Sequence, residues 1–285
     1  MQEYGLNRRR DAFRHFARKI RLEQDRKAQS GSSLQAAQLR ALVKRCHLAD
    51  YRTLLATFKD GTVKILHADP PYGTHRRYAA NNDHAGRAAH DAGTVEEALE
   101  VTLDVLRFWQ SKLVAGGCLL LWQPAGPIRM EVLQTAKECG WDIAHELIWD
   151  KGKTLLGDLT APYSISTEKL LVLIRQGDAL LDHGLVPGIE SRSDILRFDP
   201  VGQRSTAPDD SHLFQKPEIL CEFLLNKHSY QGELVVDLFG CSGSFCIAAE
   251  RLHRNWVYIE SNEENFKWGA ERIGTFIVQV QGLAG

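Results

Sequence analysis

Apolar residues recur along this chain at two spacings, one typical of strands and one typical of helices. Short apolar runs bounded by turn residues predict buried strands over 62–68, 118–122, 142–149, 168–174, 233–238 and 255–260. The helical period predicts helices over 34–45, 94–113, 127–140, 244–252 and 262–273, and another that begins at Pro217. Strands that alternate with helices indicate an α/β fold, with a mostly parallel sheet and helices on both of its faces.

Three segments lie outside this alternation. Residues 7–28 predict an amphipathic helix with a basic polar face, and a Q-S-G-S-S stretch separates this helix from the rest. We therefore divide the chain into a basic N-terminal helical arm, 1–33, and one α/β domain, 34–285. Residues 73–93 form a long polar stretch, for which we expect a loop that is either functional or disordered. Residues 176–214 show little periodicity, so we expect an excursion from the domain.

The composition is that of a soluble globular protein. Of 285 residues, 44% are hydrophobic and 25% are charged, and no apolar run is long enough for a membrane span. The six cysteines are scattered without metal-ligand spacing, which predicts reduced thiols in a cytoplasmic protein that binds no metal. The net charge of −1 conceals an uneven distribution, because the first thirty residues hold nine basic and four acidic side chains. A basic arm on an acidic body is compatible with a nucleic-acid partner.

A glycine turn between a strand and a helix is the first candidate for chemistry. Gly240 and Gly243 permit close approach of a ligand to the backbone, and the following helix offers N–H groups. Glu260 ends the next strand, where an acid can accept hydrogen bonds from ribose hydroxyls. The turn lacks the G-x-G-x-x-G and G-x-x-x-x-G-K-[ST] patterns, which disfavours a dinucleotide site and a P-loop. An ordinary strand–turn–helix is the alternative interpretation.

The tetrapeptide Asp69-Pro70-Pro71-Tyr72 directly follows the predicted strand 62–68, at the same edge of the sheet as the glycine turn. Two consecutive prolines hold the backbone rigid and leave carbonyl groups free to accept hydrogen bonds. Asp69 and the Pro70 carbonyl can together bind the exocyclic amine of a planar base, and Tyr72 can stack on its ring. In the alternative interpretation, Asp69 caps a turn and Tyr72 packs in the core.

These residues resemble the motifs of the amino-methyltransferases, which transfer a methyl group from S-adenosylmethionine to the exocyclic amine of adenine or cytosine. D-P-P-Y stands at 69–72, a Q-K-P box at 215–217, and an F-x-G-type cofactor turn at 237–244. This motif order is similar to that of the permuted β class of DNA methyltransferases. The resemblance covers residues 46–273. It implies a Rossmann-like fold, S-adenosyl-L-methionine as cofactor, and N6-adenine methylation of a flipped base in double-stranded DNA, as in restriction–modification systems.

The resemblance also implies a role for each matched position. Catalysis would rest on Asp69, Pro70, Pro71 and Tyr72. The cofactor would be bound by Asp50, Ala68, Asp69, Gln215, Lys216, Asp237, Leu238, Phe239, Gly240, Cys241, Ser242, Gly243, Ser244, Glu260, Ser261 and Asn262. Leu238 and Cys241 depart from the D-P-F-x-G-S-G-T pattern of the class, and Ala49 replaces the glycine of its G-D pair.

DNA would be bound by arginines of the arm, of the 73–93 loop and of the 176–214 excursion, where the family places its target-recognition region. These arginines are Arg8, Arg9, Arg10, Arg76, Arg77, Arg87, Arg192, Arg197 and Arg204. Trp122 and Trp149 stand at strand ends, where they either line the base pocket or pack in the core. Most of the histidines, a group that includes His67, are expected in loops or at the surface.

Other activities stay open at this point. D-P-P-Y in this family favours adenine over cytosine, with an N4-cytosine DNA methyltransferase as the alternative. An RNA adenine methyltransferase would act on the same amine, and an inactive nucleic-acid binding module could keep the fold. A carbon-5 cytosine enzyme is disfavoured, because the chain has no Pro-Cys pair to supply a nucleophilic thiolate. The sequence also leaves open a homodimer.

Overall fold

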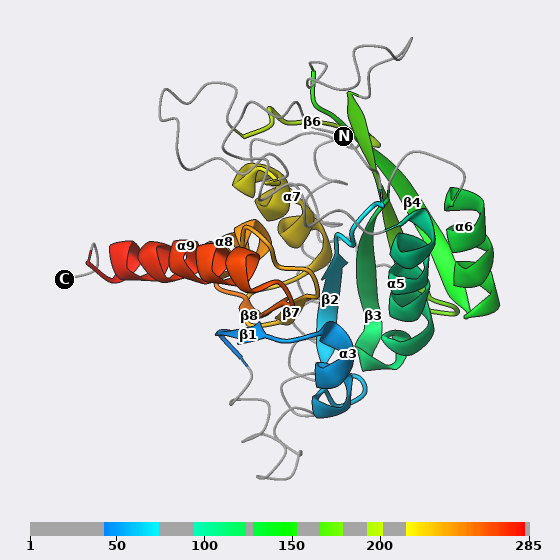
Figure 1. Ribbon diagram of the computed structural model, residues 1–285, viewed down its shortest axis with the longest axis horizontal. Helices are drawn as coiled ribbons and strands as arrows, with labels where there is room; N and C mark the ends of the chain where they lie inside the picture. The colour runs from blue at the N-terminus through cyan, green and yellow to red at the C-terminus, as the bar shows by residue number, and fades with distance from the viewer. Residues whose placement is uncertain are drawn as a thin grey trace, which may run out of the picture. The chain divides into compact units, whose positions relative to one another are not determined.

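The computed structural model describes residues 43–73, 94–123, 128–152, 166–178, 193–201 and 215–282, which belong to one unit of the chain, Val43–Gly285 (Figure 1). The predicted basic arm lies outside the described residues, as do nearly all of the 73–93 loop and much of the 176–214 excursion. Within the described ranges, no helix combines the length and the apolar character that a membrane crossing requires.

The described strands form one eight-stranded sheet. Their bounds are β1 Arg45–Leu48, β2 Val63–Ala68, β3 Leu113–Gln123, β4 Trp141–Asp150, β5 Thr167–Arg175, β6 Ile195–Arg197, β7 Leu234–Asp237 and β8 Asn255–Glu260. The order across the sheet is β1-β8-β7-β2-β3-β5-β4-β6. β5 runs antiparallel to β3 and β4, and the other neighbouring pairs are parallel. The predicted mostly parallel sheet is confirmed.

Helices cover both faces of this sheet, as predicted (Figure 1). Their bounds are α3 Tyr51–Leu54, α5 Val95–Phe108, α6 Arg129–Glu138, α7 Glu218–His228, α8 Ser244–Arg251 and α9 Glu263–Gly282, with 3-10 turns at Leu55–Thr57 and Gln110–Lys112. Leu120 and Trp122 of β3 pack in one core cluster with side chains of α7, α8 and α9. Leu119 and Leu121, which alternate with these residues along β3, are buried on the opposite face of the sheet, which α5 and α6 cover.

Two strands and the start of one helix form as their sequences predict. β2 and β7 are buried at every position, which is expected of parallel strands that are covered on both faces. The capping box of α5 is present, because the Glu97 N–H donates to the Thr94 hydroxyl at 3.1 Å and the Thr94 N–H donates to the Glu97 carboxylate at 2.9 Å. This capping box sets the start of α5, with Thr94 as its N-cap.

One pair of glycines acts differently from its prediction. The helix predicted to reach Leu113 ends at Phe108, and β3 begins at Leu113. Gly116 and Gly117, which we expected between helix and strand, lie inside β3, and Gly116 has a φ of +71°. There β3 shifts its register against β2, and the buried Lys64 ammonium donates to the Gly116 carbonyl at 2.8 Å. The glycines therefore form an irregularity within the strand.

Three other boundaries differ from the prediction. Arg45–Leu48 form β1 beside β8, where we expected a helix to continue to residue 45. β6 lies within 176–214 and pairs with β4, so part of the expected excursion belongs to the sheet. α9 continues to Gly282, beyond the predicted end at 273. An edge strand depends on a partner that is distant in sequence, which local periodicity does not report.

The strand order of the sheet reverses between β2 and β7. β2 and β7 are neighbours, yet the chain continues from β2 to β3 on one side and from β7 to β8 on the other. Open α/β sheets form a ligand crevice at the carboxyl ends of two such strands. Asp69 directly follows β2, and Asp237 is the last residue of β7.

Two glycines of α9 allow a matched test of how this helix packs on the glycine turn. A Cβ atom at Gly269 would lie 2.1 Å from the Cys241 carbonyl oxygen and 2.3 Å from the Tyr258 hydroxyl oxygen, whereas one at Gly274 would meet nothing within 4 Å. Alanine is favoured over glycine inside a helix by roughly 0.5–1 kcal/mol. We therefore expect Gly274→Ala to raise Tm and Gly269→Ala to lower it in thermal unfolding followed by circular dichroism. Equal shifts in both variants would contradict this packing.

Candidate active site

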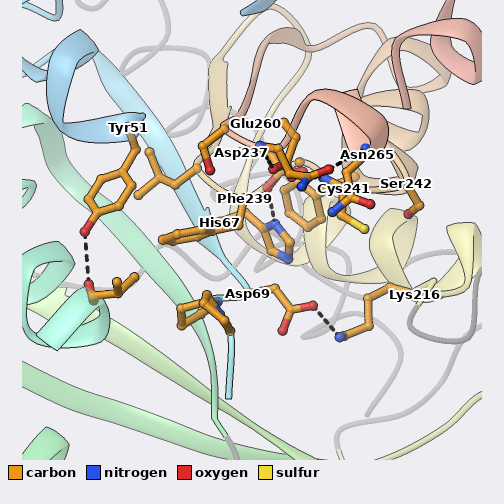
Figure 2. Close-up of a pocket in the computed structure, with 18 of the residues that line it drawn as sticks. Tyr51, His67, Asp69, Lys216, Asp237, Phe239, Cys241, Ser242, Glu260 and Asn265 are labelled. Atoms are coloured by element: carbon orange, nitrogen blue, oxygen red, sulfur yellow. Dashed lines mark hydrogen bonds and ion pairs between the residues drawn. The ribbon is translucent and has the colours of Figure 1, made fainter. Parts of the chain in front are cut away.

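A cavity of about 320 Å³ opens at the carboxyl edge of the sheet, where β2 and β7 meet (Figure 2). Most of the predicted site residues line it: Asp50, Asp69, Pro70, Pro71, Tyr72, Lys216, Asp237, Leu238, Phe239, Gly240, Cys241, Ser242, Ser244, Glu260, Ser261 and Asn262. Ala68, Gln215 and Gly243 are buried and do not line it. The fold thus brings the D-P-P-Y residues and the glycine turn to one cavity.

Several lining residues were not assigned from the sequence. They are Ala49, Tyr51, Arg52, His67, Val101, Glu168, Cys221, Phe245 and Asn265. His67 could have been found, because a residue two positions before Asp69 in a strand lies on the same face. Glu168 follows no local pattern, since only the antiparallel course of β5 brings its start to this edge. Within the described residues, no group of three or more His, Cys, Asp or Glu side chains could hold a metal ion.

Asp69 is held by two polar neighbours. Its Oδ1 accepts a hydrogen bond from the Tyr72 hydroxyl at 2.8 Å, and its Oδ2 lies 2.5 Å from the Lys216 ammonium. The side chain of Asp69 is 22% exposed, so the carboxylate still faces the cavity. Sequence reasoning gave Tyr72 only a stacking role, whereas its hydroxyl also orients Asp69.

Lys216 is a buried cation between two carboxylates. Its ammonium lies 3.0 Å from Glu168 in addition to Asp69, and 4.7 Å from the centre of the Trp122 ring. Burial alone would lower the pKa of Lys216, but the two carboxylates outweigh burial and raise that pKa above its usual value. Glu168 is also paired with Lys151; burial opposes its ionisation, yet the two ammonium groups lower the pKa of Glu168. Two cations and two carboxylates balance in this cluster.

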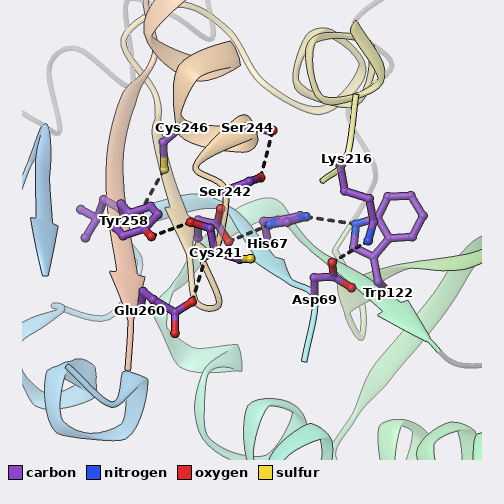
Figure 3. A network of polar contacts seen from close by, with 12 residues as sticks. His67, Asp69, Trp122, Lys216, Cys241, Ser242, Ser244, Cys246, Tyr258 and Glu260 are labelled. Atoms are coloured by element: carbon purple, nitrogen blue, oxygen red, sulfur yellow. Dashed lines mark hydrogen bonds and ion pairs between the residues drawn. The ribbon is translucent and has the colours of Figure 1, made fainter. Parts of the chain in front are cut away.

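A second chain of polar contacts joins β3, β2 and β7 at the wall of the cavity (Figure 3). The Trp122 indole N–H donates to Nε2 of His67 at 3.0 Å, and Nδ1 of His67 lies 2.8 Å from Oδ1 of Asp237. Because an indole nitrogen can only donate, Nε2 is the acceptor and Nδ1 carries the proton that Asp237 accepts. The imidazole stacks on Phe245 with ring centroids 4.0 Å apart. His67 is therefore not one of the expected loop or surface histidines: it is a buried residue of β2, as the predicted strand 62–68 implies.

The glycine turn is shaped by its contacts with β8. The Glu260 carboxylate accepts the Cys241 N–H at 2.9 Å and the Asn262 N–H at 2.7 Å. The Tyr258 hydroxyl donates to the Cys241 carbonyl at 2.8 Å. Cys241 has a φ of +39°, in the left-handed region that glycine adopts most readily, which agrees with the glycine expected there from the family pattern. A Cβ atom at Gly240 would lie 2.2 Å from the Tyr258 ring, so the turn packs directly on β8.

The end of the cavity next to α3 has an aromatic wall. The rings of Tyr51 and Phe239 lie 5.0 Å apart at an angle of 55°, and the Tyr51 hydroxyl donates to the Val101 carbonyl at 3.2 Å. Asp50 caps α3 by accepting the Arg52 N–H at 2.8 Å. The cavity therefore combines an apolar end suited to a flat ring with the acidic groups of Asp50 and Glu260.

Burial also shifts the protonation of two groups in the cavity. It raises the pKa of Glu260 above the usual range, although the N–H groups of Asn262 and Cys241 oppose this. The pKa of the Cys241 thiol is raised to about 12, first by burial and then by the carboxylates of Glu260 and Asp69. A thiol with this pKa is protonated at neutral pH and is a poor nucleophile.

Residues 63–271, about three quarters of the chain, match the family model for DNA methylases of the N6/N4 type. The match runs from the first residue of β2 into α9 and includes the residues around Asp69, Lys216, Asp237 and Glu260. The chain belongs to the N6/N4 DNA methylase family. This assignment agrees with the amino-methyltransferase resemblance of its motifs.

Individual relatives agree with the family. The type II methyltransferase M.HindIII of Haemophilus influenzae is 26% identical over 153 residues, which are 51% of this chain and 47% of that protein. The match thus spans about half the length of this curated relative. The structure of TTHA0409 from Thermus thermophilus, complexed with S-adenosyl-L-methionine, has a TM-score of 0.58 at 21% identity and covers 82% of this chain and 95% of its own. The cytosine-N4-specific PvuII DNA methyltransferase has a TM-score of 0.60 at 16% identity, with 81% and 90% covered.

Of the arginines predicted to bind nucleic acid in this methylase, only Arg197 lies among the described residues. It stands on β6, its side chain is 70% exposed, and its Nε lies 3.7 Å from Oδ2 of Asp150. The other predicted arginines, those of the arm and of the two long segments, lie outside the described residues. Their role stays a prediction.

The raised pKa of the Cys241 thiol can be tested by alkylation. At pH 8 only about 1 in 10,000 such thiols is ionised, so iodoacetamide should leave Cys241 of the native methylase unmodified. The half-buried Cys139 at the end of α6 serves as the comparison, and peptide mass spectrometry measures both. Alkylation of native Cys241 as fast as in the urea-unfolded chain would contradict this prediction.

Proposed function

We propose that this protein transfers a methyl group from S-adenosyl-L-methionine to the exocyclic N6 amine of adenine in double-stranded DNA. The observation that carries the proposal is the meeting of Asp69, at the end of β2, with the glycine turn and Glu260 in one cavity. Membership of the N6/N4 DNA methylase family supplies the reaction class. The order of the motifs, with D-P-P-Y before the cofactor turn, supports the permuted β class.

The cavity residues fit the proposed cofactor. The carboxylate oxygens of Glu260 accept backbone N–H groups, among them those of Cys241 and Asn262. A carboxylate offers about four lone-pair sites, so it can also accept a ribose hydroxyl. The Tyr51 and Phe239 rings offer an apolar surface for an adenine ring. The glycine turn lets the chain approach the remainder of the molecule closely. When bound, the cofactor supplies an electrophilic methyl group.

The D-P-P-Y residues suit the amine of a flipped base. A carboxylate oxygen of Asp69 and the Pro70 carbonyl can accept the two N–H bonds of an exocyclic amine and so orient its nitrogen. The Tyr72 ring offers a stacking surface for the base. The protonated state of the Cys241 thiol disfavours covalent attack on a base, which leaves direct displacement by the amine as the chemistry that these side chains support.

N4-cytosine methylation is the second candidate, since the fold resembles that of the cytosine-N4-specific PvuII methyltransferase. Adenine is favoured by the D-P-P-Y form of the motif. The exocyclic amines of the two bases present the same pair of N–H donors, so Asp69 and Pro70 can serve either base. RNA offers the same adenine amine and is the third candidate substrate to test.

The deciding experiment incubates the full chain and methyl-labelled S-adenosyl-L-methionine with one nucleic acid at a time. The three nucleic acids are genomic DNA, single-stranded DNA and total RNA. Digestion to nucleosides and mass spectrometry identify the product. We expect N6-methyladenine from double-stranded DNA. N4-methylcytosine would replace the adenine proposal with the second candidate, methyladenosine from RNA alone would replace the polymer, and transfer to none of these substrates would overturn the proposed function.

Asp69→Asn tests the role of the carboxylate. The amide keeps the size of the side chain but loses the charge that pairs with Lys216 and one of the acceptor oxygens. We expect turnover to fall roughly 100-fold or more, while S-adenosyl-L-methionine affinity by calorimetry changes little. Asp60→Asn, at the opposite end of β2, is the matched control and should leave turnover unchanged. Near-normal turnover in Asp69→Asn would remove Asp69 from the mechanism.

Glu260→Gln tests the cofactor end of the cavity. The amide can accept only one of the two backbone N–H bonds and carries no charge, so we expect Kd for S-adenosyl-L-methionine to rise by roughly tenfold. Glu263→Gln, on the exposed start of α9, is the control.

The pH dependence of cofactor binding gives the same test independently of activity. Because burial raises the pKa of Glu260, its carboxylate gains a proton as pH falls before an ordinary glutamate does. Wild-type affinity should therefore weaken on acidification, starting above the usual glutamate range, and the Glu260→Gln variant should lack this step. The same pH profile in both proteins would contradict the assignment.

A further inference from the structure

Lys216 lines the cavity beside Asp69 and belongs to the Q-K-P box, whose resemblance placed it among the cofactor-binding residues. Its ammonium has three N–H bonds and three close partners. Figure 3 shows two of them, the Asp69 carboxylate at 2.5 Å and the face of the Trp122 ring, and the third is the Glu168 carboxylate at 3.0 Å. The side chain is 8% exposed. These contacts direct its charge toward Asp69.

We propose that Lys216 is a positioning residue for methyl transfer, which holds the Asp69 carboxylate ready for the target amine, and that Glu168 in turn holds Lys216. This assignment rests on the proposed function and deepens it. It moves Lys216 from the cofactor-binding set to the group that orients the base amine.

The geometry around Asp69 supports this role. Asp69 follows the last residue of β2, so the orientation of its carboxylate depends on side-chain partners. Tyr72 binds Oδ1 and Lys216 binds Oδ2, and together the two contacts set the plane of the carboxylate. Each oxygen keeps a further lone pair, so an amine can bind without displacing either partner.

The cost of burying charge explains why the Lys216–Asp69 pair needs Glu168 as a further partner. A single buried ion pair seldom repays its loss of hydration, whereas a cluster with further partners can do so. Glu168 also pairs with Lys151, whose ammonium lies 4.9 Å from the centre of the Trp149 ring. β4 and β5 therefore carry the support for Lys216, since Trp149 and Glu168 are register partners across these two strands.

A lysine that bound the cofactor instead would leave a different pattern. Its ammonium would have a donor available toward the glycine turn, whereas the contacts of Lys216 go to Asp69, Glu168 and Trp122. The carboxylates also keep Lys216 charged, because they raise its pKa in spite of burial. A permanent cation beside Asp69 suits orientation of a carboxylate and does not suit proton transfer.

The first test compares Lys216→Met with Lys227→Met in the full 285-residue chain. Lys227 also lies over an aromatic ring, Phe223, at 5.6 Å, but outside the cavity, which makes it the matched control. We expect Lys216→Met to lower kcat at saturating S-adenosyl-L-methionine by roughly 100-fold. Its Kd for the cofactor should stay within about twofold of the wild type. Lys227→Met should keep both values.

A double variant protects this test against misfolding. Lys216→Met alone leaves two carboxylates beside the single cation of Lys151, and an unpaired buried charge is destabilising. Lys216→Met with Glu168→Gln restores the balance, since Asp69 and Lys151 remain as one charge of each sign. The double variant should match the wild type in Tm more closely than the single variant does, and it should still have low kcat because Asp69 lacks its partner.

Rescue separates positioning from a structural role. In Lys216→Ala, added ethylammonium should restore part of kcat in proportion to its concentration, while tetramethylammonium, which has no N–H donor, should not. Wild-type kcat in the Lys216 variants, or a raised cofactor Kd with unchanged kcat at saturation, would overturn the assignment. A wild-type chain that methylates no nucleic acid would instead refute the proposed function, so the two failures are distinguishable.

Discussion

The pairing of β2 with β7 is the interaction on which the rest of the site depends. Ile65, Leu66 and His67 of β2 stand opposite three consecutive residues of β7, and every position of both strands is buried. The Leu238 N–H extends this pairing by donating to the His67 carbonyl at 3.0 Å. Because both strands are parallel and central, the segments that leave their carboxyl ends must share one crevice.

This pairing also accounts for the polar side chains inside the core. A buried imidazole or carboxylate is costly unless each polar atom has a partner. His67 and Asp237 are register partners on adjacent strands, so each supplies what the other lacks, and Trp122 of the next strand satisfies the remaining nitrogen. The apolar packing of the sheet and the polar network are therefore parts of the same arrangement, and a change in register would disrupt both.

Much of the fold could be predicted from the sequence, because the signals for its central elements are local. The apolar run of β2 and the capping box at Thr94 are signals carried by residues within or next to one element. β1 and β6 could not be predicted, because a short edge strand forms only where a partner strand is already present. The position of Gly116 inside β3 could not be predicted for the same reason, since its carbonyl is bound by Lys64 of the neighbouring strand β2.

The sequence by itself determined the types and order of the central elements, and it pointed to the residues that we propose for the chemistry, D-P-P-Y and the glycine turn. Hydrophobic period, capping and proline stiffness act over a few residues, so they can be read without the fold. Only the tertiary structure decided which charges meet. Lys216 and Asp69 are 147 residues apart in the chain, and Glu168 reaches them because β5 runs opposite to its neighbours. Ion pairs of this kind depend on strand order and direction, which arise from the packing of the whole sheet.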